Sequence, residues 1–155
     1  MNLSTSVRDF VDACETGKGW HECKEFCDLE ATFEAQADAL AEVTTLEGYC
    51  EWMKTMYTPM PDAHYEMRQF YFDEKSNSAL AFAVFYGTHT AVGGPVPPTG
   101  GSTASHYVYH IVLEGDRIKH MTKIWNDLSE FTHKHNIKPI VGHTFNFNEI
   151  PNAHE

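Results

Sequence analysis

The chain has 155 residues, of which 42% are hydrophobic and 13% aromatic, and this composition is typical of a single folded domain with one hydrophobic core. Eleven basic residues against 22 acidic residues give a formal net charge of −11. Because such a surface repels phosphate backbones and anionic lipids, the composition argues against a nucleic-acid partner and against a membrane-surface role.

The sequence predicts a cytoplasmic protein. No apolar run approaches the roughly 18 residues of a membrane span, and the N-terminal MNLSTSVRDFVDACE has no basic segment followed by an apolar core. The four cysteines, Cys14, Cys23, Cys27 and Cys50, lie on expected helices and form no CxxC pair. We therefore expect reduced, mostly buried thiols.

The first half of the chain is expected to be mostly helical. Residues 4–6 (STS) can cap a first helix, whose apolar positions recur at helical spacing and which ends at Gly17. A second short helix follows, and ATFEAQ (31–36) is typical of a short strand. Thr44 and Glu47 have the spacing of a capping box and predict the start of a third helix.

The second half has the alternating period of β-strands. Four long strands are expected at residues 63–72, 79–90, 104–113 and 117–126, followed by a last helix near 127–135. Helices followed by consecutive strands predict an α+β fold, in which helices cover one face of a curved antiparallel sheet and leave a cavity for a small ligand. We assign residues 1–136 to one domain and 137–155 to a C-terminal extension.

Two neighbouring segments carry a family resemblance. GTHTAVGGPVPPTGGS (87–102) and YVYHIVLEGDRIKHMTKIWND (107–127) are similar to the SnoaL-like polyketide cyclase group of the NTF2-like superfamily, in which GTHTG, a glycine and PPTG precede two long strands. The resemblance implies a cone: a curved antiparallel sheet of four long strands plus a short one, with three N-terminal helices over the concave face. One departure is Gly101, because that position is usually basic.

The resemblance does not fix a reaction, because the superfamily contains isomerases, dehydratases, hydrolases, cyclases and non-enzymatic binders. An overlay with its steroid isomerases puts Phe10, Ala35 and Tyr109 at the positions of a tyrosine, an aspartate base and a protonated aspartate. An enolising proton shuttle needs a base close to the carbon acid. We therefore reject steroid isomerase activity.

The same overlay predicts which side chains face the cavity. The expected inward residues are Phe82, Val84, Tyr86, Tyr107, Tyr109, Ile111, Met121, Lys123, Trp125 and Asp127. The opposite face then carries His106, Val108, His110, His120 and Thr122. Many relatives pair through that face, so the resemblance implies a homodimer through the sheet.

The last expected strand leaves two registers open. Cyclases of the group typically end in RIVEHWD, whose aspartate does acid–base work, whereas this chain has RIKHMTK (117–123). Matching the RI pairs puts Lys123 at the aspartate position, and matching the histidines puts Thr122 there. A shift of one residue turns every side chain of a strand to the other face.

The candidate catalytic residues are Lys123, Asp127, Tyr109 and His89. Burial would lower the pKa of Lys123; a neutral lysine can act as a base or form a Schiff base, and a charged one can polarise a carbonyl. Asp127 and Tyr109 as neighbours favour the charged form. Each residue also has a structural interpretation: Lys123 as an exposed strand lysine, Asp127 as a helix N-cap, Tyr109 as a core or rim aromatic, and His89 as a loop residue bonded to backbone.

The leading hypothesis is a cofactor-free acid–base enzyme (cyclase, isomerase, dehydratase or hydrolase) that acts on a small, apolar, oxygenated ring compound. The expected substrate-binding residues are Trp52, Tyr57, Phe82, Tyr86, Tyr107, Met121 and Trp125. No metal is expected, because the histidines lack partner cysteines or carboxylates at ligand spacing. The alternatives are a non-catalytic binder of a hydrophobic metabolite and an NTF2-like protein-interaction domain.

Overall fold

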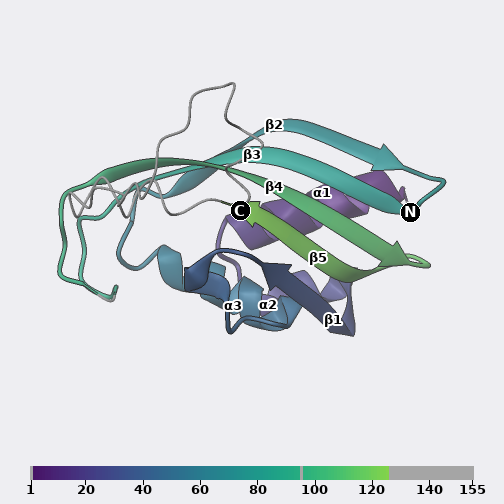
Figure 1. The fold of residues 1–155 in the computed structure, drawn as a ribbon, viewed down its shortest axis with the longest axis horizontal. Coiled ribbons are helices and arrows are strands. Elements are labelled where there is room, and N and C mark those ends of the chain that lie inside the picture. The colour runs from purple at the N-terminus through teal and green to yellow at the C-terminus, as the bar shows by residue number, and fades with distance from the viewer. Residues whose placement is uncertain (1, 95, 126–155) are drawn as a thin grey trace, which may run out of the picture.

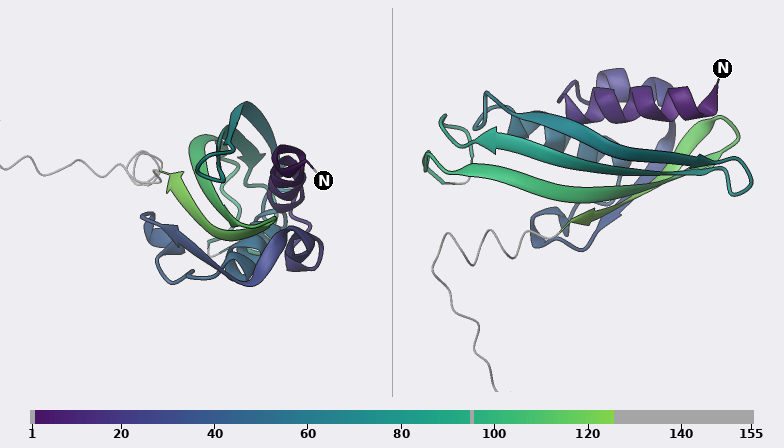
Figure 2. Two further views of the ribbon diagram at one scale, coloured as in Figure 1. Left: turned by 90° about the vertical axis from the view of Figure 1, so that its right-hand side faces the viewer. Right: turned by 90° about the horizontal axis from the view of Figure 1, so that it is seen from above.

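The computed structural model describes residues 2–94 and 96–125, which form one five-stranded sheet with helices packed on one face (Figure 1, Figure 2). The helices are α1 (Leu3–Glu15), α2 (Trp20–Cys23) and α3 (Leu46–Met56), with 3₁₀ turns at Lys24–Phe26 and Asp38–Leu40. The strands are β1 (Cys27–Ala35), β2 (His64–Asp73), β3 (Ser78–Thr88), β4 (Ser102–Glu114) and β5 (Arg117–Trp125). In this part of the chain, the helices are too short or too polar to cross a bilayer.

The three expected N-terminal helices are present, but other residues cap the first and the third, and the helix expected at 127–135 lies outside the described residues. The side chain of Asn2 accepts a hydrogen bond from the Ser4 N–H at 3.0 Å, so α1 begins before the predicted STS cap. Thr45 caps α3 by accepting from the Gly48 N–H at 3.1 Å, and the predicted capping box starting at Thr44 is therefore wrong. The expected end of α1 is confirmed, since it finishes at Glu15, before Gly17 with its positive φ of 69°.

The sheet has the order β1-β5-β4-β3-β2 and is mixed (Figure 1). β2, β3, β4 and β5 pair antiparallel, as expected for four long consecutive strands. The additional strand, β1, pairs parallel with β5, so it adds a parallel edge to the expected antiparallel sheet of four long strands. β1 is also longer than the predicted 31–36 strand, and Cys27 therefore lies on a strand and not on a helix.

The concave face of the sheet packs against the helices and forms the core (Figure 2). In β4 and β5 the inward side chains alternate with outward ones, as the sequence predicts, because Tyr107, Tyr109 and Met121 are buried while His106 is exposed. The pairing of Tyr109 with Lys123 settles the open register: Lys123, and not Thr122, lies on the inner face.

The expected inward direction of Phe82, Val84 and Tyr86 is wrong. Directly paired residues share a face of a sheet, and Phe82 pairs with Val108, which lies on the outer face. The inner face of β3 instead carries buried Ala79, Ala81, Ala83 and Phe85. Both faces of this strand are apolar, so its sequence alternates in size and not in polarity, and the small residues are the ones that lie under the helices.

Candidate functional site

A cavity of about 260 Å³ lies between α3 and the inner faces of β3, β4 and β5. Most of its walls are apolar or aromatic, with a few polar tips, which is the usual make-up of a small-molecule site. The lining residues are Trp52, Met53, Met56, Pro59, Met60, Phe85, His89, Val96, Gly101, Thr103, Ser105, Tyr107, Lys123 and Trp125.

Three of the expected substrate-binding residues line this cavity. Trp52 comes from α3, Tyr107 from β4 and Trp125 from β5. The two tryptophan rings lie 6.2 Å apart, and the indole N–H of Trp125 donates to the Ser105 hydroxyl at 2.5 Å. That hydrogen bond fixes one wall of the cavity in place, because it uses the only polar atom of the indole.

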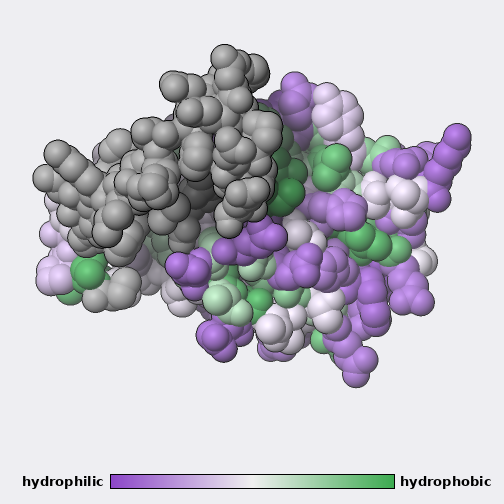
Figure 3. Space-filling model, in the orientation of Figure 1, coloured by the Kyte–Doolittle hydropathy of each residue, from purple (hydrophilic) through white to green (hydrophobic). Residues whose placement is uncertain are grey.

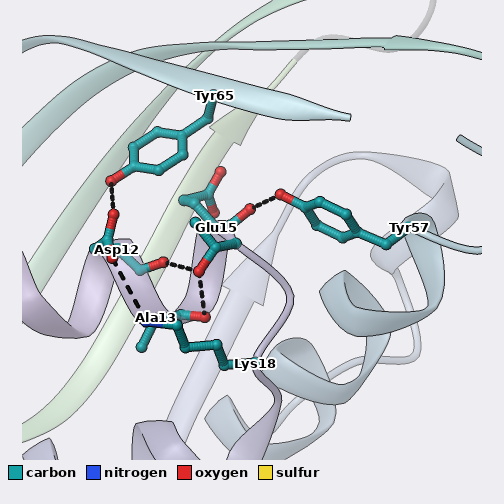
Figure 4. A network of polar contacts seen from close by, with 7 residues as sticks. Asp12, Ala13, Glu15, Lys18, Tyr57 and Tyr65 are labelled. Carbon is teal, nitrogen blue, oxygen red and sulfur yellow. Dashed lines mark hydrogen bonds and ion pairs between the residues drawn. The ribbon is translucent and has the colours of Figure 1, made fainter. Parts of the chain in front are cut away.

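The other four expected substrate-binding residues do not line the cavity. Met121 is fully buried in the core, and Tyr57 packs edge-on against Phe85, with its hydroxyl directed at the backbone carbonyl of Glu15 (Figure 4). Phe82 and Tyr86 are on the outer face. Phe82 stacks on His106, and Tyr86 stacks on His64 and accepts a hydrogen bond from Arg68 at 2.8 Å.

Lys123 projects from β5 into an aromatic enclosure on the cavity wall. Only 6% of the residue is exposed. Its Nζ donates to the Tyr49 hydroxyl at 2.9 Å and lies 4.8 to 5.7 Å from the centroids of five rings, those of Tyr49, Trp52, Tyr107, Tyr109 and Trp125. Burial lowers the pKa of the Lys123 ammonium, and the negative charge of Glu15 opposes that shift. The ring faces also favour the charged form through cation–π attraction.

Glu15, at the C-terminal end of α1, is the charged partner that sequence reasoning missed. It is fully buried, and its two carboxylate oxygens accept hydrogen bonds from the hydroxyls of Tyr107 and Tyr109. Burial raises the pKa of Glu15, while Lys123 and the two phenols oppose the rise. A signal was present: position 15 follows Val11 by four residues, and so falls on the buried stripe of the helix.

Two phenols connect Glu15 to Lys123. Tyr109 uses its hydrogen on the Glu15 carboxylate, so Tyr49 is the donor in the hydrogen bond between the Tyr49 and Tyr109 hydroxyls. Lys123 in turn donates to Tyr49. The chain of donors therefore runs in one direction, from the Lys123 ammonium to the Glu15 carboxylate. Burial raises the pKa of both Tyr49 and Tyr109, which keeps the phenols protonated.

A separate hydrogen bond occupies the next acidic side chain of α1. The hydroxyl of Tyr65, on β2, donates to the Asp12 carboxylate at 3.1 Å (Figure 4). Lys18 lies 3.7 Å from the other oxygen of Asp12, and both side chains are about half exposed. Asp12 is thus paired outside the core, and Glu15 is the acidic group of α1 that is enclosed with Lys123.

His89 lies on the wall of the same cavity, in the loop after β3. Its backbone donates to Gly101 and accepts from Gly100, both at 2.9 Å, and these bonds close the base of the loop. Its Nδ1 is 3.3 Å from the Thr99 hydroxyl. The backbone of His89 is thus held by its own hydrogen bonds, and its imidazole, which lines the cavity, is held at Nδ1 by Thr99. Asp127 lies outside the described residues, so both its catalytic and its capping interpretation stay predictions.

The model of the SnoaL-like polyketide cyclase family matches residues 5–132 of the chain. Among solved structures, a candidate polyketide cyclase, IdmH from Streptomyces antibioticus, is 17% identical with a TM-score of 0.67, over 87% of this chain and 99% of that one. A candidate hydroxylase, AclR from Streptomyces galilaeus, is 12% identical with a TM-score of 0.67, over 90% and 85%.

A third structure, a candidate SnoaL-like polyketide cyclase from Jannaschia sp. CCS1, is 15% identical with a TM-score of 0.63, over 85% of this chain and 93% of that one. A search of the curated proteins found no match. At these identities the solved structures establish the NTF2-like fold, and the family match covers most of the sequence. The chain therefore belongs to the SnoaL-like polyketide cyclase family.

Proposed function

We propose that this protein is a cofactor-free acid–base enzyme that acts on a small, apolar, oxygenated ring compound bound in the cavity, by cyclisation or by a related isomerisation, dehydration or hydrolysis. The observation that carries the proposal is the buried Lys123 ammonium on the cavity wall, linked through Tyr49 and Tyr109 to the Glu15 carboxylate. Burying two charges costs several kcal/mol per ion unless they compensate each other. A pair of this kind is a frequent mark of a functional site.

The walls of the cavity suit a flat ligand. Trp52 and Trp125 offer two ring faces, and Met53, Met56 and Met60 offer flexible apolar contacts that adapt to different ring shapes. The polar groups gather at Lys123, Tyr107, Ser105 and His89. A ring compound with oxygen atoms at one edge would place its apolar faces against the indoles and that edge toward the lysine.

In the proposed mechanism Lys123 acts as a cation. Its Nζ has three hydrogens, of which one goes to Tyr49. Another is available to a carbonyl oxygen in the cavity, and the ammonium then stabilises the negative charge that develops on that oxygen as an enolate forms. Since the five surrounding rings shield Nζ from bulk water, this stabilisation acts at a low local dielectric and exceeds what the same contact would give in solvent.

The proposed base is His89. It lines the same cavity as Lys123, and a neutral imidazole can take a proton from a carbon next to the polarised carbonyl. The resulting carbanion attacks a second carbonyl of the same molecule in a cyclisation, and the imidazolium returns its proton to the new alkoxide. Glu15 touches no atom in the cavity and acts through the two phenols, as a positioning residue that keeps Lys123 charged.

The test uses purified protein with a panel of aromatic ketones, hydroxy-ketones and 1,3-diketones, and follows conversion by chromatography and mass spectrometry. Lys123→Met and His89→Asn are each expected to lower kcat/KM for any accepted substrate by about 100-fold or more. Lys119→Met is the matched control, because Lys119 is a surface lysine of the same strand whose Nζ lies 3.4 Å from Asp28. Unchanged turnover in the Lys123→Met variant would refute the catalytic assignment.

A second candidate function, a binder of a hydrophobic metabolite, has one observation in its favour. In the described part of the chain, the lining contains no carboxylate, and the only imidazole is that of His89. Binding of a panel compound with no chemical change, in the wild type as in Lys123→Met, would support the binder. If no compound raises the melting temperature, the remaining alternative is an interaction domain with a merely structural cavity.

We also propose a homodimer through the outer face of the sheet. Leu80 and Ile124 are 47% and 65% exposed there, beside the half-buried Phe82 and Val108. In the coloured part of Figure 3, hydrophilic residues surround smaller hydrophobic patches, a mixture that is common at interfaces that form in water. In light scattering, Ile124→Glu should shift the protein to a monomer, whereas Leu29→Glu, at an exposed position of β1, should not.

A further inference from the structure

Three cysteines from three helices meet in the helical layer, away from the cavity. Cys14 of α1, Cys23 of α2 and Cys50 of α3 are fully buried, and their sulfur atoms all lie within 4.8 Å of one another. The Cys14 and Cys50 sulfurs are 3.8 Å apart. Among the residues that the structure describes, no histidine or carboxylate joins them as a fourth ligand. All four cysteines of the chain are free and buried, in agreement with the sequence-based expectation.

The spacing of the three sulfurs fits a single bound centre. With bonds of about 2.3 Å, as in zinc thiolates, three sulfurs lie about 3.8 to 4.0 Å apart around a tetrahedral or planar centre, and about half an ångström closer around a pyramidal centre with a lone pair. The Cys14 to Cys50 distance of 3.8 Å is therefore close to all of these geometries, and the sulfur atoms of the whole cluster already lie within 4.8 Å of one another. Small rotations about χ1 would therefore complete the site without moving a helix.

The net charge of the complex indicates which kind of ion or atom the three sulfurs would bind. Three thiolates give a complex of charge −2 with a monovalent ion such as Cu(I), −1 with Zn(II) and zero with a trivalent centre. Cys14 is followed by the buried Glu15, which Lys123 balances, and Cys50 is followed by Glu51, which lies 3.9 Å from Lys54. Neither of these pairs has charge left over to compensate a charged complex. A buried net charge costs several kcal/mol, and structural zinc also prefers a fourth ligand.

We propose that Cys14, Cys23 and Cys50 form a binding site for one trivalent arsenic atom, held by three sulfur bonds in a neutral complex. The reaction with arsenous acid forms three As–S bonds and breaks three As–O bonds, and each thiol proton leaves in a water molecule. No atom changes oxidation state, so no oxidant or reductant takes part. Since the ligands come from α1, α2 and α3, the bound atom ties the whole helical layer together.

The experiment incubates the full chain, reduced with a phosphine, with arsenite and then measures native mass and melting temperature. We expect one arsenic per chain with the loss of three hydrogens, and a melting temperature raised by several degrees, because the folded state alone presents the three sulfurs together. Arsenic X-ray absorption should count three sulfur neighbours, and this readout needs no variant.

Matched variants locate the site. Cys27→Ser changes the fourth buried cysteine, on β1, and should retain the arsenic, whereas Cys50→Ala and Cys23→Ser should each lose the mass increase and the thermal shift. Two or fewer sulfur neighbours, or retention of the thermal shift by Cys50→Ala, would overturn the assignment. A thermal shift with Zn(II) or with a Cu(I) complex, but none with arsenite, would also overturn it. None of these readouts depends on the proposed enzymatic activity.

Discussion

Lys123 and Glu15 are linked through two phenolic hydroxyls and not through a direct ion pair. The link joins the last described strand to the first helix, across 108 positions of sequence. Both charges are withdrawn from water, and each shifts the pKa of the other back toward its usual value. The pair is therefore a single electrostatic unit, and its two members should be tested together.

Glu15→Gln should destabilise the protein by about 3 to 5 kcal/mol, because it leaves the Lys123 ammonium buried without its counter-charge. The measurement is the free energy of unfolding in urea at pH 7. Glu47→Gln, at an exposed position of α3, is the control and should change it by less than about 0.5 kcal/mol.

The double variant Glu15→Gln with Lys123→Met should recover much of that loss, since an apolar side chain of similar length then fills the place of the charge. Additive losses from the two single substitutions would contradict the coupling. That result would mean that Lys123 finds its compensation elsewhere, in the surrounding rings alone.

Lys123 should make the stability of the wild type rise with pH in the alkaline range. Its folded pKa is lowered by burial, and its unfolded pKa is near 10.4. Between these two pKa values the unfolded state binds more protons than the folded state, so the free energy of unfolding rises with pH. The destabilisation caused by the buried ammonium is absent above about pH 10.4 and grows as the pH falls toward the folded pKa.

The measurement compares wild type with Lys123→Met from about pH 8 to pH 10.5, a range that reaches the unfolded pKa of lysine, near 10.4. The difference in unfolding free energy, wild type minus variant, should increase with pH. Lys119→Met is the matched control, because Lys119 lies on the same strand with its side chain 40% exposed and its Nζ 3.4 Å from Asp28. A flat difference for Lys123→Met would show that the folded pKa is not lowered.

Thr103→Phe should block the cavity. Thr103 lines it from β4, and a phenyl ring there fills much of the 260 Å³ volume. Calorimetry with any ligand of the wild type should show an affinity at least about tenfold lower, which is about 1.4 kcal/mol. Ala104→Phe is the matched control, because it adds the same ring at the next position, on the exposed outer face. Equal effects of both substitutions would place the ligand outside the cavity.

Phe85→Ala should cost about 3 to 5 kcal/mol, since this ring packs in the core against Tyr57. Phe82→Ala should cost clearly less, because the Phe82 ring lies half-buried on the outer face against His106. Urea unfolding of the two variants thus tests the register of β3. A larger loss for Phe82→Ala would mean that the strand faces the other way.

The strands and their turns were largely predictable from sequence because alternation and hairpin signals act over a few residues. The four long strands lie within two residues of their expected bounds, and Lys123 faces inward as one of the two registers predicts. β3 was misjudged because both of its faces are apolar. When polarity does not alternate, the inner face is chosen by the room available under the helices, which is a property of the assembled fold.

The site was only half predictable. Lys123, Tyr109 and Trp125 lie near one another along the chain, in a segment that carries the family pattern, but Glu15 and Tyr49 lie on helices that reach the same place only after folding. A buried glutamate can be recognised from sequence when it occupies one position of a helix face whose other positions are all apolar. The meeting of Cys14, Cys23 and Cys50 has no such local mark, since their spacing follows from how three helices pack.

The position of β5 in the sheet has a consequence for how the protein is made. β5 lies between β4 and β1, so both neighbours have an open edge until residues 117–125 have left the ribosome. The nascent chain can form the hairpins of β2, β3 and β4, but β1 must wait about 90 residues for its only partner in the described sheet. Closure of the sheet and creation of the lysine-bearing wall are then one late event, and a chaperone that shields the waiting edge would raise the yield of active protein.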